Sequence, residues 1–391
     1  MDAMGRIGLI IQSPRQETLQ QARELLLGHS QANQITAELP LIDGFAVEVD
    51  PGTLVLLPKL GTLEGELHVA PDMAVSLGPE TESGPRPTLD DGRRTLNVER
   101  VWEQGYRGRG VGIAVVDTGI APHPDLASRI VAFKDYINER TQTYDDHGHG
   151  THVAGIAAGS GEKSSGRYQG IAPEANLISI KVLSDKGKGK SSQIIEGIQW
   201  AVDNKQTYNI RAMNISIGGT AWIGDGWDPM ARAAGRAMER GIFVAVAAGN
   251  SGPDAKTIET PGISEAVCTV ANLHGHFTPD RGDDTISESS SRGPTKFSGN
   301  AKPDVAAPGT WITSCDRWEG YTSMSGTSMA SPMVAGTAAL LIQAKPSLNG
   351  PEVKRILMDG AAPLPDVPST AQGWGMIDPP VALAIAKAQD A

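Results

Sequence analysis

The sequence is short of cysteine, of positive charge and of long apolar runs, and each shortage excludes a class of protein. Its two cysteines, Cys268 and Cys315, cannot form a disulfide framework, and the apolar neighbours of Cys268 indicate a buried strand with a free thiol. Lysine and arginine number 34 against 45 acidic residues, so the net charge of −11 excludes nucleic acid as the main partner. No apolar run reaches the roughly 18 residues that a membrane-spanning helix needs. We therefore expect a soluble protein with no membrane partner.

The chain of 391 residues is long enough for two or three domains. Its first residues, Met1–Gly5, lack the basic start and the apolar stretch of a secretory signal peptide. The expected localisation is either cytoplasmic or secreted with a leader that is absent from this chain.

The pattern of residues 1–77 predicts a small α+β domain. An amphipathic helix follows the first strand, and its apolar face consists of Leu19, Ala22, Leu25 and Leu26. Apolar or alternating segments predict strands at residues 6–12, 35–39, 45–49 and 67–69. Residues 78–94 are rich in proline, glycine and charge without periodicity, which predicts an exposed linker of the kind that proteases cut.

Residues 95–391 alternate between apolar strands and helices, which predicts an α/β fold: a doubly wound, mostly parallel sheet with helices on both faces. Continuous apolar runs at 111–116, 210–217 and 242–248 have the composition of strands that are buried on both faces. Ligands bind such sheets outside the carboxyl ends of the strands. Asp117, Gly218 and Asn250 each lie at the end of one of these runs, so we expect them to line one cleft.

Asp117, His149 and Ser328 occur in that order and offer an orienting acid, a base and a nucleophile. A serine hydroxyl is a weak nucleophile, so Ser328 needs His149 to accept its proton. Asp117 would hold the imidazole in the productive tautomer and stabilise its charged form. His149 and Ser328 both open helices that are rich in small residues, and backbone donors at a helix start stabilise negative charge. Asn250 would add a side-chain donor to the oxyanion, beside the Ser328 amide.

Each of these residues also has a simpler explanation when it is considered alone, because caps and turns are common uses of Asp, His, Ser and Asn. The Asp-Thr-Gly sequence that begins at Asp117 also matches the loop of aspartic proteases. Those enzymes need a second aspartate, and no second Asp-Thr-Gly or Asp-Ser-Gly occurs. His147, His149 and His152 could instead hold zinc, although they lack the helical i, i+4 spacing of a zincin.

The motifs around these residues resemble those of the subtilisin-like serine peptidases, whose triad has the same chain order. The resemblance covers roughly residues 95 to 385. Its motifs are Asp117-Thr118-Gly119-Ile120, His149-Gly150-Thr151-His152-Val153-Ala154-Gly155, Ala247-Ala248-Gly249-Asn250, Ser290-Ser291-Arg292-Gly293-Pro294, Lys302-Pro303-Asp304, Ala307-Pro308-Gly309 and Gly326-Thr327-Ser328-Met329-Ala330-Ser331-Pro332. The stretch 251–263 is most similar to the branch that contains the bacterial intracellular-type subtilases.

The resemblance implies a serine endopeptidase that hydrolyses proteins or peptides through an acyl-enzyme, with the triad and the oxyanion donor named above. It implies that residues 1–77 are a ferredoxin-like propeptide that inhibits the peptidase domain, residues 95–391. Self-cleavage somewhere between residues 74 and 94 would release this propeptide. The chain would then be made as a zymogen, with its own propeptide as an intramolecular partner.

The family also implies that the substrate lies extended between two segments of backbone. The residues that would bind it are Ser216, Ile217, Gly218, Gly187, Gly189 and Gly249. Glu259 aligns near the floor of the pocket for the residue before the cleaved bond, which would favour lysine or arginine there; the alternative is an exposed loop glutamate. Lys186, Lys188 and Lys190 flank the same edge and would favour acidic residues upstream of the cleaved bond, unless they form a solvated loop.

No cofactor is expected for the chemistry. Asp125 matches a calcium-ligand position of the family, but the loop Ser160–Tyr168 lacks the asparagine-rich calcium-binding pattern of secreted members. A structural calcium ion is therefore an open alternative. Met333 stands where many members have histidine, and this change lies beyond the triad.

The rival function is a pseudo-protease or an inhibitor-locked binding protein that keeps the fold without turnover. All four catalytic positions carry the residues that the chemistry needs, which favours the enzyme.

Overall fold

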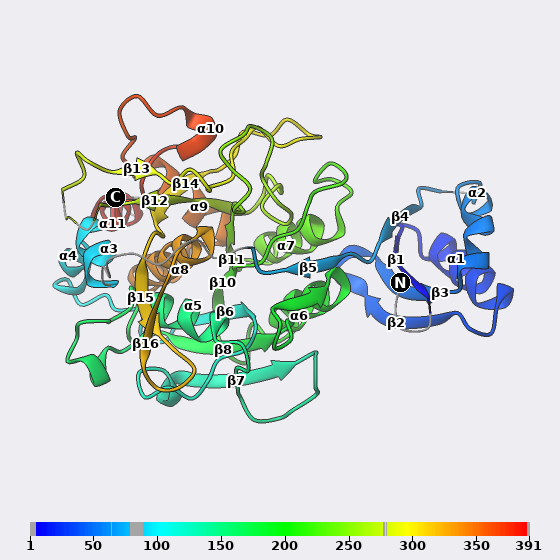
Figure 1. Ribbon diagram of the computed structural model, residues 1–391, viewed down its shortest axis with the longest axis horizontal. Coiled ribbons are helices and arrows are strands. Elements are labelled where there is room, and N and C mark those ends of the chain that lie inside the picture. The colour runs from blue at the N-terminus through cyan, green and yellow to red at the C-terminus, as the bar shows by residue number, and fades with distance from the viewer. Residues whose placement is uncertain (1–4, 64, 79–88, 277, 279, 389–391) are drawn as a thin grey trace.

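The structure, a computed structural model, describes residues 5–63, 65–78, 89–276, 278 and 280–388. A small N-terminal unit projects from one end of a larger unit (Figure 1). The first described residues lie in the small unit, and the last lie on the far side of the large one. Within the described ranges, no helix combines the length and the apolar character that crossing a membrane requires.

The N-terminal unit is a four-stranded antiparallel sheet with the strand order β2-β3-β1-β4. Its elements are β1 (Ile7–Gln12), α1 (Gln16–His29), β2 (Gln34–Leu39), β3 (Gly44–Val49), the single helical turn α2 (Leu57–Leu60) and β4 (His68–Pro71). Buried side chains of β1, α1 and β3, among them Ile11, Leu26 and Phe45, form a core separate from that of the large unit. This strand order is that of a ferredoxin-like split β-α-β unit, in which short helical turns replace the second helix.

The large unit contains a mainly parallel sheet with the order β13-β12-β11-β10-β6-β8-β7, and β14 also pairs with β12. The strands are β6 (Gly112–Asp117), β7 (Ile130–Asp135), β8 (Asn176–Lys181), β10 (Ile210–Ile215), β11 (Phe243–Ala247), β12 (Cys268–His274), β13 (Thr285–Ile286) and β14 (Val305–Pro308). Only β13 pairs antiparallel, at the edge. The three predicted apolar runs form β6, β10 and β11, which are adjacent and parallel. The predicted parallel sheet is therefore confirmed.

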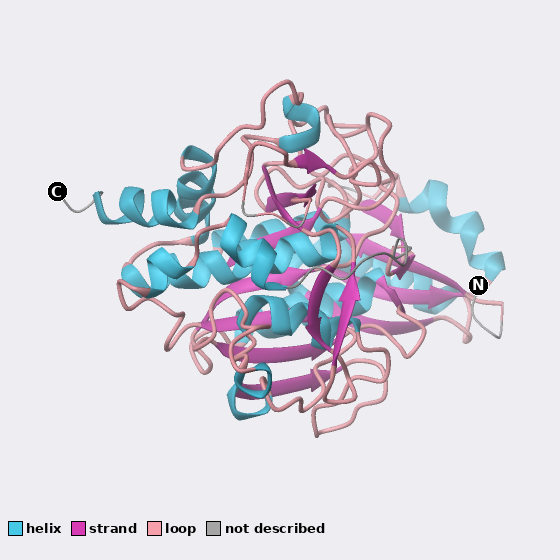
Figure 2. Cartoon of the chain, turned by 60° about the vertical axis from the view of Figure 1, so that its left-hand side comes forward, coloured by secondary structure: helices cyan, strands magenta, loops and turns pink. Residues whose placement is uncertain are grey.

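Helices cover both faces of this sheet. Helices α5 (His149–Ala158) and α8 (Thr327–Ala344) pack against each other, and so do α6 (Ser191–Asp203) and α7 (Pro229–Glu239). Gly150 of α5 lies against Asp117, whereas Gly197 of α6 lies against Val116. Because consecutive residues of a strand point to opposite faces, α5 and α6 lie on opposite sides of β6. Figure 2 shows the strands between these helical layers.

Two short ladders complete the large unit and the connection to it. Strand β15 (Ile312–Cys315) pairs with β16 (Tyr321–Met324), and β5 (Ala74–Ser76) pairs antiparallel with β9 (Lys188–Lys190). The remaining helices are α3 (Leu89–Thr95), α4 (Glu99–Trp102), α9 (Gly350–Asp359), α10 (Ser369–Gln372) and α11 (Pro379–Ala388). Helix α3 begins within the predicted linker 78–94, and residues 79–88 of that linker lie outside the described residues. Cys268 and Cys315 are free thiols, as predicted, and both are buried, which the sequence had indicated for Cys268 alone.

Candidate active site

Asp117 and His149 meet at the carboxyl edge of the central sheet. Asp117 is the last residue of β6, His149 is the first residue of α5, and both side chains are buried. Nδ1 of His149 lies 2.7 Å from Oδ1 of Asp117. The amide of Thr118 donates to the same carboxylate oxygen at 2.7 Å, and the Thr118 hydroxyl accepts from the amide of Gly150 at 2.9 Å. The strand end and the helix start are thus tied together, which fixes the orientation of the imidazole.

Ser328 lies in the first turn of α8, within the helix that covers β10 and β11. Its hydroxyl donates to the carbonyl oxygen of Ser216 at 3.2 Å, and the Ser216 hydroxyl donates to the carbonyl oxygen of Ser328 at 3.0 Å. Ser216 follows β10, which ends at Ile215. The strand was predicted to continue to residue 217, two residues further. The reason is that Ser216 leaves the strand ladder to make these contacts with α8.

Asn250 follows β11 and is oriented by Thr327. Its Oδ1 accepts hydrogen bonds from the Thr327 amide at 3.0 Å and from the Thr327 hydroxyl at 3.1 Å. Because both groups donate, Oδ1 is the atom that faces Thr327, which leaves Nδ2 as the free donor of this side chain. A methyl group on Gly78 or on Gly326 would lie 3.1 Å from Nδ2. The role of Thr327 was not predicted from the sequence, although its place directly before Ser328 in the Gly-Thr-Ser motif was a signal.

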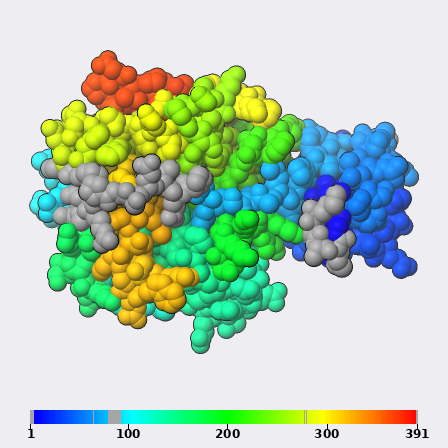
Figure 3. All heavy atoms as spheres, in the orientation of Figure 1, coloured from blue at the N-terminus to red at the C-terminus, as the bar shows by residue number. Residues whose placement is uncertain are grey.

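The residues that the sequence nominated for backbone binding of substrate lie around the segment 74–78. Strand β5 runs antiparallel to β9, and the amide of Leu77 donates to the Gly187 carbonyl at 3.0 Å. On the other side, Ser76 forms an isolated antiparallel bridge with Gly218. Figure 3 shows this light-blue segment lying in the surface of the large unit. The structure therefore brings Gly187, Gly189 and Gly218 together on the two sides of one extended segment. Ile217, beside Gly218, is buried.

Glu259 is partly buried between the glycines that follow β10 and β11. A methyl group on Gly218 would collide with its Oε2, and one on Gly249 would lie 2.6 Å from its Cδ. Oε1 accepts a hydrogen bond of 2.7 Å from the Ser251 hydroxyl. Burial raises the pKa of Glu259, and the hydrogen bonds from Ser251 and from the Asn250 backbone oppose that rise. Glu259 was expected either near the floor of the pocket or as an exposed loop glutamate, and its partial burial does not fit the exposed alternative.

The three lysines of the same edge differ from one another. Lys186, in the loop before β9, and Lys188, the first residue of β9, both have exposed side chains. Lys190 is half-buried, and its Nζ lies 2.7 Å from Oε1 of Glu48 in the N-terminal unit.

Lys181, at the end of β8, is a fully buried cation whose role was not predicted from the sequence. Its Nζ donates to the carbonyl oxygens of Thr118 and Leu183 at 2.6 and 2.7 Å and to Oδ1 of Asp146 at 2.7 Å. Lys181 is paired with Asp117 across the β6–β8 ladder. It therefore joins the loop after β6 to the loop before α5. The available signal was a lone lysine that ends an apolar strand.

The histidine run does not converge on a metal. Nε2 of His152 lies 3.0 Å from the carbonyl oxygen of Ile312 and 3.1 Å from that of Thr322. Burial, together with the nearby His149, lowers the pKa of His152 to about 3. This imidazole is therefore neutral and donates its proton to β15 and β16. The zinc alternative has no support, and Asp117 faces His149 rather than a second aspartate.

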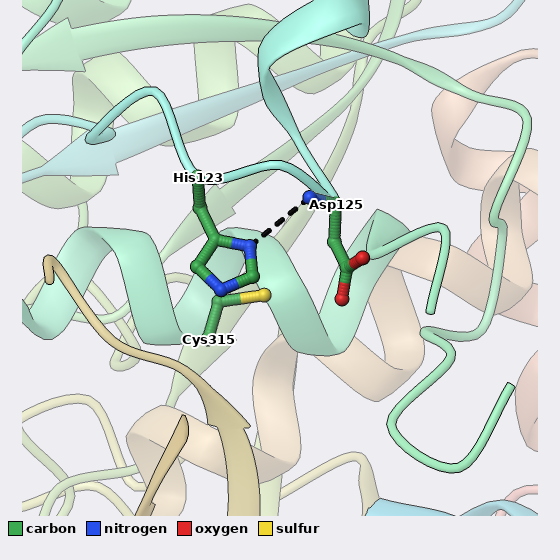
Figure 4. A group of neighbouring side chains, drawn as sticks. All are labelled: His123, Asp125 and Cys315. Carbon is green, nitrogen blue, oxygen red and sulfur yellow. Dashed lines mark hydrogen bonds between the residues drawn. The ribbon is translucent and has the colours of Figure 1, made fainter. Parts of the chain in front are cut away.

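In the described part of the chain, one group of His, Cys and acidic side chains is close enough to share an ion: His123, Asp125 and Cys315 (Figure 4). Nδ1 of His123 accepts the Asp125 amide at 3.0 Å, and Nε2 faces the Gly320 carbonyl at 3.0 Å. Two donors, the Lys163 amide at 2.8 Å and the Tyr321 hydroxyl at 2.7 Å, point at the Asp125 carboxylate. Calcium is bound by six to eight oxygen ligands, whereas His123 and Cys315 offer nitrogen and sulfur and both carboxylate oxygens of Asp125 already accept hydrogen bonds, so these residues do not fit a calcium ion.

Comparison with known proteins assigns the family. The model of the Subtilase family matches residues 108–375. The serine protease AprX of Bacillus subtilis (strain 168) is 46% identical over 311 residues, which cover 74% of this chain and 70% of AprX. Subtilisin DY of Bacillus licheniformis is 35% identical over 295 residues, covering 74% of this chain and 97% of that protein. Thermitase of Thermoactinomyces vulgaris is 35% identical over 251 residues, which cover 64% of this chain and 81% of thermitase. The chain, whose sequence motifs already resembled this group, therefore belongs to the subtilase family of serine endopeptidases.

Proposed function

We propose that Asp117, His149 and Ser328 are the catalytic triad of this endopeptidase and that Asn250 is its oxyanion donor. The observation that supports the triad is the buried contact of 2.7 Å between His149 and Asp117, at the sheet edge where Ser328 also lies. The anchored Oδ1 of Asn250 supports its role, because a donor that is held in place needs no reorganisation during the reaction.

In this reaction the Ser328 hydroxyl attacks the carbonyl carbon of the substrate while His149 takes its proton. Negative charge develops on the carbonyl oxygen, where Nδ2 of Asn250 and the first amides of α8 stabilise it. His149, stabilised as imidazolium by Asp117, then gives the proton to the leaving amine and the acyl-enzyme forms. Water, activated by the same imidazole, hydrolyses the acyl-enzyme and restores Ser328. Protein and peptide chains are the substrates, and no cofactor takes part.

We further propose that residues 1–77 are an inhibitory propeptide. The observation that supports this is the position of residues 74–78, which pair with β9 on one side and with Gly218 on the other, as an extended substrate would. Gly78 lies against Nδ2 of Asn250 and therefore corresponds to the residue before the cleaved bond. Ser216, Ile217, Gly218, Gly187, Gly189 and Gly249 would form the backbone walls of the substrate groove.

Contacts outside the groove hold the N-terminal unit in place. The Gln12 side chain lies 2.6 Å from a guanidinium nitrogen of Arg232, and His68 stacks on Trp227 with ring centroids 3.4 Å apart. Lys190 and Glu48 add the ion pair described above. A unit bound at several places beside the groove supports the role of an inhibitor.

Incubation of the purified chain with casein and a fluorophosphonate probe tests both proposals. We expect the wild-type protein to be labelled at Ser328, to degrade casein and to produce a fragment whose new terminus lies between residues 74 and 94. The Ser328→Ala variant, which lacks only the Ser328 hydroxyl, should do none of these things. Casein degradation by Ser328→Ala would contradict the triad, and an active protein that keeps its full length would contradict the propeptide.

A further inference from the structure

The start of helix α6 binds a carboxylate of the N-terminal unit. The amide of Ser192 donates a hydrogen bond of 2.9 Å to Oδ1 of Asp72, and the Ser192 hydroxyl donates one of 2.8 Å to Oδ2. The next residue of the segment is held too, because the amide of Ser191 donates to the carbonyl oxygen of Met73 at 2.9 Å. The first turn of α6 thus holds one acidic side chain and one backbone carbonyl of the same extended segment.

Helix α6 has no acidic group of its own at this end. Its first turn contains no aspartate or glutamate, and the residue before it, Lys190, has a side chain without an acceptor. The free amides and the dipole at a helix start favour a negative charge. Burial raises the pKa of Asp72, and the two Ser192 donors and the charge of Lys190 oppose that rise. The two Ser192 donors and Lys190 thus stabilise the charged carboxylate, although burial and the charge of Glu48 outweigh them while the N-terminal unit is in place.

The segment also fixes how far this carboxylate lies from the catalytic residues. Asp72 precedes Gly78 by six residues, and between them β5 is paired residue by residue with β9. A substrate chain that binds in the same register would place its own side chain, six residues before the attacked carbonyl, against Ser192. When the N-terminal unit leaves, Lys190 also loses Glu48 and can turn to that side chain.

We propose that the start of α6 is a substrate subsite that selects an acidic residue six positions before the residue whose carbonyl is attacked. Its ligand is the carboxylate of aspartate or glutamate, bound by the amide and hydroxyl of Ser192 with Lys190 beside them. This inference rests on the proposed function, because it takes the register from residues 72–78. Of the three lysines, it assigns this role to Lys190 alone, and it adds the helix start, for which no sequence pattern had indicated a ligand.

Two fluorogenic peptides test the subsite on the self-processed protein obtained from the full chain. Both are acetylated and carry residues 72–77 followed by lysine and the fluorogenic amide, and one has asparagine in place of Asp72. We expect kcat/KM to be about 3- to 10-fold higher for the aspartate peptide at low ionic strength, the range for a carboxylate at a partly buried helix start. The ratio should fall as salt is added, because exposed charges are screened.

Variants separate the two contributions to this ratio. Ser192→Ala removes the hydroxyl and should bring the ratio below about 3, and Lys190→Met should weaken its dependence on salt. Ser347→Ala makes the same chemical change on an exposed surface far along the chain and should leave the ratio unchanged. A short peptide with only residues 75–77 and lysine reports whether each variant keeps an intact catalytic site.

The possible outcomes distinguish a failure of the subsite from a failure of the proposed protease function. Equal kcat/KM for the two long peptides with the wild-type protein would overturn the subsite and leave the protease assignment intact. A ratio that Ser192→Ala does not change would also overturn it. No cleavage of any peptide would overturn the proposed function, and the subsite with it.

Discussion

Replacing Glu259 by glutamine removes one negative charge from the space between Gly218 and Gly249 and keeps an oxygen that can accept from Ser251. We expect the wild-type enzyme to cleave peptides with lysine before the cleaved bond faster than the same peptides with methionine, which is similar in length and uncharged. In Glu259→Gln this preference should disappear, because only the charge of the pocket changes.

The size of the effect follows from the partial burial of Glu259. Two unit charges about 4 Å apart near a protein surface attract each other by about 4 kcal/mol. The loss of water from both groups offsets part of this attraction, and hydrogen bonds to charged groups have a net value of about 1.5–3 kcal/mol. Since about 1.4 kcal/mol is a factor of ten, the ratio of kcat/KM for lysine over methionine should fall about 10- to 100-fold.

The same preference should depend on pH in one direction. Burial raises the pKa of Glu259, whereas a lysine side chain stays charged up to about pH 10. The ion pair is therefore present above the raised pKa of Glu259 and is lost as the pH falls through it. A pH effect on the catalytic step itself acts on both peptides, so it cancels in the ratio.

The assay measures kcat/KM for the two peptides across pH with wild type, Glu259→Gln and Glu259→Ala. The alanine variant separates loss of charge from loss of the hydrogen bond to Ser251. If Glu259→Gln keeps the lysine-to-methionine ratio within about twofold of wild type, Glu259 is not the floor of this pocket. A wild-type ratio that does not change with pH would contradict the reasoning in the same way.

Four further changes have definite expected results. Asn250→Ala should lower kcat by about 10²–10³-fold with little change in KM, which is the loss measured in a subtilisin when one oxyanion donor is removed. A loss below about tenfold in steady-state assays would contradict that role. Pro79→Ala should speed cleavage after Gly78, seen by N-terminal sequencing, because the proline ring replaces the amide hydrogen of the leaving nitrogen with a carbon and restricts rotation there; an unchanged rate would argue against this register. Lys181→Met should lower the free energy of unfolding by about 3–5 kcal/mol in urea titrations on a Ser328→Ala background, because it leaves the buried partners of the ammonium group unpaired; a loss under about 1 kcal/mol would contradict this. A metal chelator should leave Tm unchanged within about 1 °C, since donors occupy the Asp125 carboxylate, and a clear fall would show that a metal binds after all.

The placement of the candidate catalytic residues was predictable because each lies at the end or the start of an element with a clear sequence pattern. Asp117 ends an apolar run that can only be a buried strand, and His149 opens a helix of small residues. In a parallel sheet with helical crossovers these positions meet at one edge. The sequence patterns of the strand and the helix, together with this rule for parallel sheets, were therefore enough to predict that Asp117 and His149 approach each other.

The residues that hold this constellation in place were not predictable in the same way. Thr327 orients Asn250 from 77 residues away, and Asp72 reaches the start of α6 from 120 residues away. At the start of α6, Ser191 and Ser192 donate to Met73 and Asp72 of the N-terminal unit. Hydrogen bonds between distant segments leave no periodicity, so only the three-dimensional structure shows which polar residue meets which.

The contacts that hold the N-terminal unit on the large unit also join distant segments, so local sequence patterns did not predict them. A cut after Gly78 breaks one bond and leaves the ladder between β5 and β9, the pair of Lys190 with Glu48 and the stacking of His68 on Trp227 in place. All these contacts join the same folded N-terminal unit to the large unit. When one contact breaks, the others keep its two groups close together, so it can form again. We therefore expect the cut unit to stay bound as an inhibitor. Full activity should require loss of the whole unit, whose small separate core makes it the less stable of the two.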